Sequence, residues 1–99
     1  MKRVMANEVA SYLGEEIVLK GWVYRLRRLS RVNFIILRDR TGSIQVSAEP
    51  SLLENLGLSL ESVVAVQGRV VADERAPGGF EVAAEKIEVI SAAKNLPLN

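Results

Sequence analysis

The chain has no cysteine and no histidine among its 99 residues. Without cysteine it can form neither a disulfide nor a thiolate metal site. Without histidine it lacks the side chain that most often serves as a general base and as a metal ligand. The sequence also shows no paired carboxylates, no phosphate-cradling loop and no metal-ligand spacing. We therefore expect no catalytic residues, no metal and no cofactor.

Long apolar runs are absent as well. No stretch approaches the roughly 18 apolar residues that suggest a membrane span, and the start of the chain, MKRVMANEVA, lacks the apolar core of a secretory signal. With 48% hydrophobic and 25% charged residues, the composition is that of an ordinary soluble protein. We expect a cytoplasmic protein with no membrane partner, built as one domain over residues 1–93 with a linker-like tail over residues 94–99.

The positive charge is concentrated in one segment. Residues 20–40 hold seven basic side chains and one acid, a balance of +6, whereas the whole chain carries only +1. Six of the seven are arginines, which can form paired hydrogen bonds with phosphate or stack on a base. Such a stripe on an otherwise acidic domain indicates a local anionic partner. The alternative is a solvated hairpin whose arginines serve only solubility.

The hydrophobic pattern predicts five strands, over residues 16–28, 32–39, 43–48, 62–73 and 80–91. Short helices are expected over residues 8–14 and 50–57, each ending at a glycine. Gly21 and Gly68 interrupt two long strands and permit the bends that a small barrel needs. These elements predict an all-β fold, the five-stranded Greek-key OB-fold barrel, whose second and third strands form a binding face for oligonucleotides. A two-sheet sandwich is the alternative, but five strands are too few for one.

The stretch VNFIILRDRTGSIQVSA, residues 32–48, carries the strongest functional signal. Its alternation puts one set of apolar side chains toward the core: Ile35, Leu37, Ile44 and Val46. Phe34 then lies on the outer face, the face that Gln45 marks as polar. An exposed ring beside an amide and surrounded by arginines is suited to binding single-stranded bases. The alternative is that Phe34 and Ile36 are core residues covered by the N-terminal helix or by a partner domain.

Four successive stretches of the chain resemble the N-terminal anticodon-binding domain of aspartyl- and asparaginyl-tRNA synthetases. They are LKGWVYRLRR, NFIILRDRTGSIQV, ESVVAVQGRVVADERAPGGFEV and EKIEVISAAKNLPL. The resemblance covers residues 15–98, and its pieces are specific jointly, not singly. GWVYR and ADERAPGG are more similar to the archaeal-type asparaginyl branch than to the aspartyl branch. The resemblance implies an OB-fold whose partner is a tRNA anticodon loop of asparagine or aspartate type.

The resemblance also implies the residues that bind bases. In that family the second anticodon base, a uridine, stacks on a second-strand phenylalanine and is read by a third-strand glutamine, which match Phe34 and Gln45 here. A fifth-strand glutamate takes part in reading the first base, a guanosine or its queuosine form, and the candidates are Glu81 and Glu85. Either glutamate could instead be a surface carboxylate on an edge strand. For the third base, the resemblance implies recognition by Tyr24 and the loop ERAPGG.

Arginines near the binding face have two interpretations. Arg25, Arg28 and Arg31 bind phosphates, or they only keep the barrel soluble. Arg38 and Asp39 are expected to be structural, as an ion pair or a turn cap at the end of the second strand.

A catalytic domain does not fit in the sequence. In the family the motif LPL leads into a hinge and then a large catalytic domain, for which 99 residues leave no room. We expect either the excised domain of a synthetase or a free-standing protein that kept the barrel. A synthetase catalytic domain or a second copy of the chain is a candidate partner.

Two other functions stay open beside anticodon binding. A general single-strand-binding protein would need further exposed aromatics, for which Trp22 and Tyr24 are the candidates. A protein-docking module would use the apolar patch of Phe34 and Ile36. Salt separates these functions, because phosphate-driven binding weakens steeply with salt and apolar docking does not.

Overall fold

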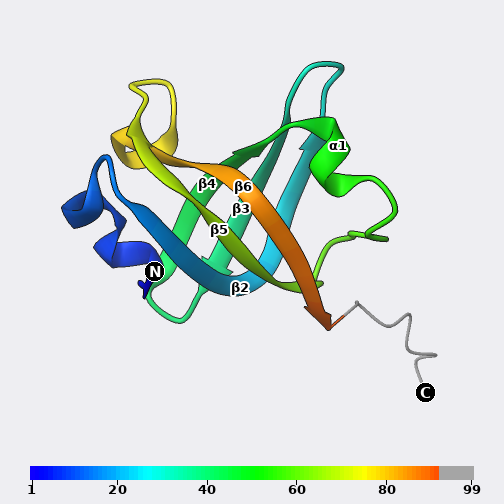
Figure 1. Cartoon of the computed structure of the whole chain (residues 1–99), viewed down its shortest axis with the longest axis horizontal. Coiled ribbons are helices and arrows are strands. Elements are labelled where there is room, and N and C mark those ends of the chain that lie inside the picture. Colours follow the sequence, from blue (N-terminus) through cyan, green and yellow to red (C-terminus); the bar gives the residue numbers. More distant parts are fainter. Residues whose placement is uncertain (92–99) are drawn as a thin grey trace.

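Five strands form a closed barrel in the computed structural model, which describes residues 1–91 (Figure 1). They are β2 (Glu16–Arg28), β3 (Asn33–Asp39), β4 (Gly42–Ala48), β5 (Val63–Ala72) and β6 (Phe80–Ser91). The strands pair in the order β2, β3, β4, β6, β5, and β5 pairs again with β2 to close the barrel. Only β4 and β6 run parallel within it. This is the expected OB-fold barrel, and the expected tail over residues 94–99 lies outside the described residues.

Strand β2 belongs to both halves of the barrel. Residues 16–22 pair with β5, and residues 22–28 pair with β3, so that Trp22 has a partner on each side. At Gly21, immediately before this change, a Cβ atom would overlap the carbonyl oxygen of Arg38. Gly68 of β5 has the same relation to the carbonyl oxygen of Ala83. Glycine is required at both places because two backbones approach there more closely than a side chain allows.

The core fills the inside of the barrel. The four core side chains expected on β3 and β4 are at most 7% exposed, namely Ile35, Leu37, Ile44 and Val46. Buried side chains of the other long strands complete the core, among them Ile17, Leu19, Val23, Val64, Val66 and Val82. Phe34 and Ile36 are not part of this cluster. The alternating register predicted for the two strands is therefore confirmed, and Phe34 lies outside the core of the barrel. Its cover by a partner domain stays an alternative.

The segment before β2 differs from the prediction. It forms a 3-10 helix, η1 (Ala6–Tyr12), rather than a helix over residues 8–14. Gly14 follows it with φ +83°, a conformation that favours glycine and directs the chain into β2. A two-residue strand, β1 (Lys2–Arg3), pairs parallel with β2 and was not predicted.

The helix between β4 and β5 is much shorter than predicted. Helix α1 covers only Pro50–Leu53, whereas the sequence pattern suggested residues 50–57. Asn55 and Gly57 both adopt φ +64°, which is incompatible with continuing a right-handed helix. Leu53 still reaches the buried core. No helix of the described residues has the length and apolar character to span a membrane.

Asp39 fixes the turn between β3 and β4. Its Oδ1 accepts hydrogen bonds from the backbone nitrogen of Thr41 at 2.8 Å and from Thr41 Oγ1 at 2.6 Å. Its Oδ2 accepts one from the backbone nitrogen of Ala6 at 2.8 Å, which ties η1 to the barrel. Burial acts to raise the pKa of Asp39, but the hydrogen bonds from Thr41, Ala6 and Gly42 together lower it below its ordinary value.

The structural role predicted for Asp39 is thus a turn cap. Among residues 1–91, Asp39 forms no ion pair with Arg38. The guanidinium of Arg38 instead lies over the ring of Tyr24, with Cζ 5.1 Å from the ring centroid.

Candidate nucleic-acid interface

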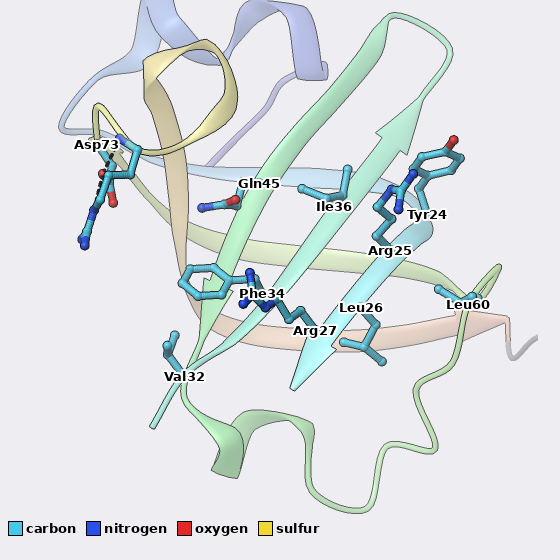
Figure 2. A pocket seen from close by; sticks show the side chains of 11 residues that line it. Tyr24, Arg25, Leu26, Arg27, Val32, Phe34, Ile36, Gln45, Leu60 and Asp73 are labelled. Carbon is cyan, nitrogen blue, oxygen red and sulfur yellow. Dashed lines mark hydrogen bonds and ion pairs between the residues drawn. The ribbon is translucent and has the colours of Figure 1, made fainter. Parts of the chain in front are cut away.

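A cleft of about 980 Å³ lies on the outer face of β2, β3 and β4 (Figure 2). Its apolar lining includes Leu26, Phe34, Ile36 and Leu60. Its polar lining includes Tyr24, Arg25 and Arg27 of β2 and Gln45 of β4. The cleft therefore combines apolar surface for stacking with hydrogen-bonding groups and positive charge.

Phe34 lies in this cleft as a half-buried ring, less exposed than the sequence suggested. Its direct neighbours across the sheet are Ser47 of β4 and Arg27 of β2. Gln45 is opposite Ile36, so the amide is diagonal to the ring (Figure 2). Diagonal neighbours on one face of an antiparallel pair are within reach of aromatic and long side chains. A base stacked on Phe34 is thus within reach of Gln45.

Gln45 is held by a residue from another strand. Its Nε2 donates a hydrogen bond to Oε1 of Glu81 at 2.7 Å. The two residues are register partners in the short parallel pairing of β4 with β6. Glu81 is only 7% exposed although it lies beside the cleft-lining Gln45.

Glu85, the other glutamate candidate, lies elsewhere. It is exposed and does not line the cleft. It sits at an irregularity of the β5–β6 register, between Ala84, which pairs with Gly68, and Lys86, which pairs with Gln67. The barrel therefore brings Glu81, and not Glu85, to Gln45.

Tyr24 is an extra residue in β2. Val23 pairs with Leu37 and Arg25 with Ile36, so Tyr24 has no partner in the register and forms a β-bulge. Its side chain is 41% exposed at one end of the cleft (Figure 2). Cζ of Arg25 lies 5.4 Å from the ring centroid, in addition to Arg38. The ring is thus flanked by two cations, and they supply positive charge beside an aromatic surface.

Of the three arginines predicted to bind phosphate, only Arg25 lines the cleft. Nη2 of Arg28 donates to the carbonyl oxygen of Leu58 at 3.0 Å and so holds the segment before β5. Arg31 is exposed in the turn before β3 and does not line the cleft. Sequence reasoning missed Arg27, which lines the cleft next to Phe34. Strand alternation, which puts Arg25 and Arg27 on one face, is the signal that could have found it.

The loop after β5 lines the cleft at the end away from Tyr24 (Figure 2). Asp73 and Arg75 line it and form an ion pair, with Nε 3.5 Å from Oδ1 (Figure 2). The side chain of Arg75 is 89% exposed. A 3-10 turn, η2 (Pro77–Gly79), then leads into β6. Part of the predicted loop ERAPGG is thus at the cleft, through an arginine that the sequence had not singled out.

Comparisons with known proteins agree with this geometry. Residues 17–90 match the tRNA_anti-codon family, described as an OB-fold nucleic acid binding domain. The aspartate–tRNA(Asp/Asn) ligase of Methanocaldococcus jannaschii is 42% identical over 95 residues, which are 87% of this chain and 21% of that protein. The asparagine–tRNA ligase of Thermus thermophilus is 39% identical over 95 residues, which are 90% of this chain and 22% of that protein.

A comparison with solved structures finds the same group of proteins. The asparaginyl-tRNA synthetase from Pyrococcus horikoshii, complexed with asparaginyl-adenylate, matches with a TM-score of 0.85 and 38% identity. The match covers 100% of this chain and 24% of that one. The chain thus spans about a fifth of the length of the curated relatives it matches. Since aspartate and asparagine ligases match at similar identity, the preference for the asparaginyl branch stays a prediction.

Proposed function

The chain belongs to the tRNA_anti-codon family of OB-fold nucleic acid binding domains, and from this premise we propose that it binds the anticodon loop of a tRNA of asparagine or aspartate type. One observation carries the proposal. The cleft on β2, β3 and β4 brings together an aromatic ring, an amide and arginines, all on the outer face of the barrel. These are the groups that single-stranded RNA needs for stacking, edge recognition and phosphate contact.

The middle anticodon base, a uridine, stacks on Phe34 in this proposal. Stacking of one base on an aromatic side chain contributes about 1–3 kcal/mol to binding. Phe34 is half-buried in the cleft, with Arg27 and Ser47 opposite it in the sheet, so that part of the ring is open to a base. Gln45 then reads the edge of the stacked base from the diagonal position.

In this proposal the first and third anticodon bases are read on either side of Phe34 and Gln45. Glu81, not Glu85, contacts the first base in this proposal. Neither glutamate lines the cleft, but Glu81 is hydrogen-bonded to Gln45, which does, and a carboxylate can accept from N1–H and N2–H₂ of guanine. Tyr24 and the loop with Arg75 are at other points of the same cleft. They are suited to the third base through stacking and hydrogen bonding.

Arginines supply the contacts with phosphate. Arg25 and Arg27 line the cleft, and each can neutralise a phosphate of the loop. Arg31 is exposed beyond the cleft and suits a flanking phosphate. Arg28 keeps part of its donor capacity, because only Nη2 is engaged with the carbonyl oxygen of Leu58.

The relatives are tRNA ligases, of which this chain matches about a fifth. We propose that the barrel supplies tRNA recognition and that amino-acid activation depends on a catalytic domain outside these 99 residues. Such a domain, or a second copy of the chain, is the proposed protein partner. A role in reading tRNA places its action in the cytoplasm.

A titration of the purified chain with anticodon stem-loops tests the proposal. We expect stem-loops with the anticodons GUU and GUC to bind more tightly than a matched stem-loop with an unrelated anticodon, and we expect affinity to fall steeply with salt. Equal affinity for all anticodons would contradict the proposal and support general binding of single-stranded RNA. RNA binding too weak to detect at low salt would favour the protein-docking alternative, for which Leu60, 54% exposed in the cleft, offers apolar surface.

A further inference from the structure

We infer that Glu81 is a positioning residue for Gln45: it holds the amide so that the oxygen, and not the nitrogen, is directed to the base stacked on Phe34. The inference rests on the proposed function, because it concerns how the middle base is read. It assigns to Glu81 a second task, separate from its own contact with the first base.

The argument begins with the barrel itself. Strands β4 and β6 are parallel neighbours over only three register pairs, and Gln45 with Glu81 is the first of them. In the next pair, Val46 and Val82, both side chains are fully buried in the core. Because side chains alternate along a strand, Gln45 and Glu81 must both lie on the outer face. Core packing thus fixes the position of the pair.

The chemistry of the pair then fixes the orientation of the amide. A free glutamine amide can rotate by half a turn and exchange its nitrogen and oxygen. An ionised carboxylate only accepts hydrogen bonds, so the group that faces Oε1 of Glu81 at 2.7 Å must be the NH₂ of Gln45. The rotated amide would set two oxygens against each other with no proton between them.

Burial makes this constraint strong. Glu81 is only 7% exposed, so water compensates poorly for a lost partner. Among the described residues, the hydrogen bond from Gln45 is the one side-chain hydrogen bond that Glu81 makes. A buried carboxylate that loses such a bond retains its desolvation cost, and this opposes rotation of the amide.

A fixed amide oxygen discriminates between the two pyrimidines. Uracil has a donor, N3–H, at the centre of its Watson–Crick edge, whereas cytosine has an acceptor, N3, at that place. With the ring held on Phe34, the oxygen of Gln45 accepts from uracil and opposes the lone pair of cytosine. If the amide could rotate, its NH₂ would serve cytosine and the discrimination would fall.

The test compares two glutamate-to-glutamine changes on β6. Glu81→Gln keeps the size of the side chain but replaces the acceptor-only group with an amide that can donate, so that either orientation of Gln45 is satisfied. Glu85→Gln is the matched control, because Glu85 is exposed and outside the cleft. The measurement is the ratio of dissociation constants for stem-loops that carry cytidine or uridine at the middle anticodon position.

We expect the unmodified chain to prefer uridine and Glu81→Gln to reduce the preference by about tenfold, the upper range for one hydrogen bond. Glu85→Gln should leave it unchanged. In a Gln45→Ala background, Glu81→Gln should change the ratio no further, because the residue that it positions is gone. An unchanged ratio in Glu81→Gln, or an equal change with and without Gln45, would overturn the inference.

A second measurement covers the case in which Glu81→Gln does not fold. In ¹⁵N NMR spectra of the unmodified chain, one side-chain amide proton of Gln45 should be shifted and slowly exchanging because it is hydrogen-bonded to a carboxylate. Averaged, rapidly exchanging amide protons would overturn the inference even without the variant. If the unmodified chain shows no middle-base preference while the amide proton is held, the proposed function fails and the Gln45–Glu81 pair is only structural, which also ends the inference.

Discussion

At the scale of single residues, the two faces of β3 have different roles: the outer face lines the cleft, and the inner face packs in the core. Phe34 lies in the cleft outside the core, while its neighbour Ile35 is fully buried. Adjacent residues of a strand therefore have opposite tasks, because successive side chains point to opposite faces. This contrast makes substitutions at the two positions informative.

Phe34→Ala should weaken RNA binding by about 1–3 kcal/mol, the contribution of one stacked base. Stability should change less than in Ile35→Ala, which opens a cavity in the core and should cost about 2–5 kcal/mol. The measurement is a urea denaturation curve and an RNA titration on the same preparation of each variant. A large loss of stability with unchanged affinity in Phe34→Ala would mean that the ring packs rather than binds.

Asp39 makes the stability of the barrel dependent on pH. Because hydrogen bonding lowers the pKa of Asp39 in the folded state, the carboxylate contributes stability above its ordinary pKa. That contribution is lost as the pH falls through the lowered value. Asp39→Asn should cost about 1–3 kcal/mol at neutral pH, since its NH₂ cannot accept the bond from Ala6 or Thr41.

The matching measurement is the free energy of unfolding at several pH values below neutrality. The unmodified chain should lose more stability than Asp39→Asn as the pH falls through the range in which Asp39 takes up its proton. Parallel curves for the two proteins would contradict a role for this carboxylate in the acid response.

At the scale of the elements, strand β2 depends on one glycine to serve two partners. A Cβ atom at Gly21 would overlap the carbonyl oxygen of Arg38, and a backbone atom cannot move aside as a flexible side chain can. The β2–β3 pairing would have to separate at the place where β2 changes from β5 to β3. The cleft lies on this second half of β2.

Gly21→Ala should therefore destabilise the barrel by about 1–3 kcal/mol, the usual cost of forced overpacking. Lys20→Ala is the control, because its side chain is exposed in the same strand and should change stability by about 0.5 kcal/mol or less. Chemical denaturation measures both. Equal stability of the two variants would show that the two backbones separate easily.

At the scale of the whole molecule, the distribution of charge governs the encounter with RNA. The segment of residues 20–40 carries a balance of +6 in a chain of +1, and the barrel brings Arg25 and Arg27 of this segment to the cleft. A positive cleft on an otherwise acidic molecule orients an anionic partner toward one face.

Arg25→Ala and Arg27→Ala should each weaken all stem-loops alike and reduce the slope of log affinity against log salt by about one unit per lost phosphate contact. Arg69→Ala is the control, because Arg69 is paired with Glu16 and lies outside the cleft. The measurement is a set of titrations at several salt concentrations. An unchanged slope in both cleft variants would indicate that these arginines do not contact phosphate.

The 99-residue chain should not activate an amino acid. Its described residues are used by the barrel, its turns and the cleft, and the match covers only about a fifth of the length of the curated relatives. Exchange of pyrophosphate with ATP in the presence of asparagine or aspartate measures this activity. Exchange that depends on the amino acid would contradict the prediction.

Local patterns in the sequence were sufficient for the strands and their faces. The boundaries predicted for β2 and β6 agree with the structure, and the alternation of β3 and β4 places Phe34 and Gln45 on the outer face. Both follow from the two-residue period of a strand, which is visible in the sequence without knowledge of the fold. The same period puts Arg25 and Arg27 on one face of β2, and both line the cleft.

Contacts between distant segments could be decided only by the tertiary structure. Glu81 meets Gln45 across 36 positions, and Asp39 meets Ala6 across 33, because closure of the barrel sets these registers. The pattern of residues 80–91 alone could not choose between Glu81 and Glu85. The bulge at Tyr24 and the early end of α1 likewise depend on backbone conformations that local propensity predicts poorly. The sequence by itself determined which side chains face outward, and the closed barrel decided which of them meet.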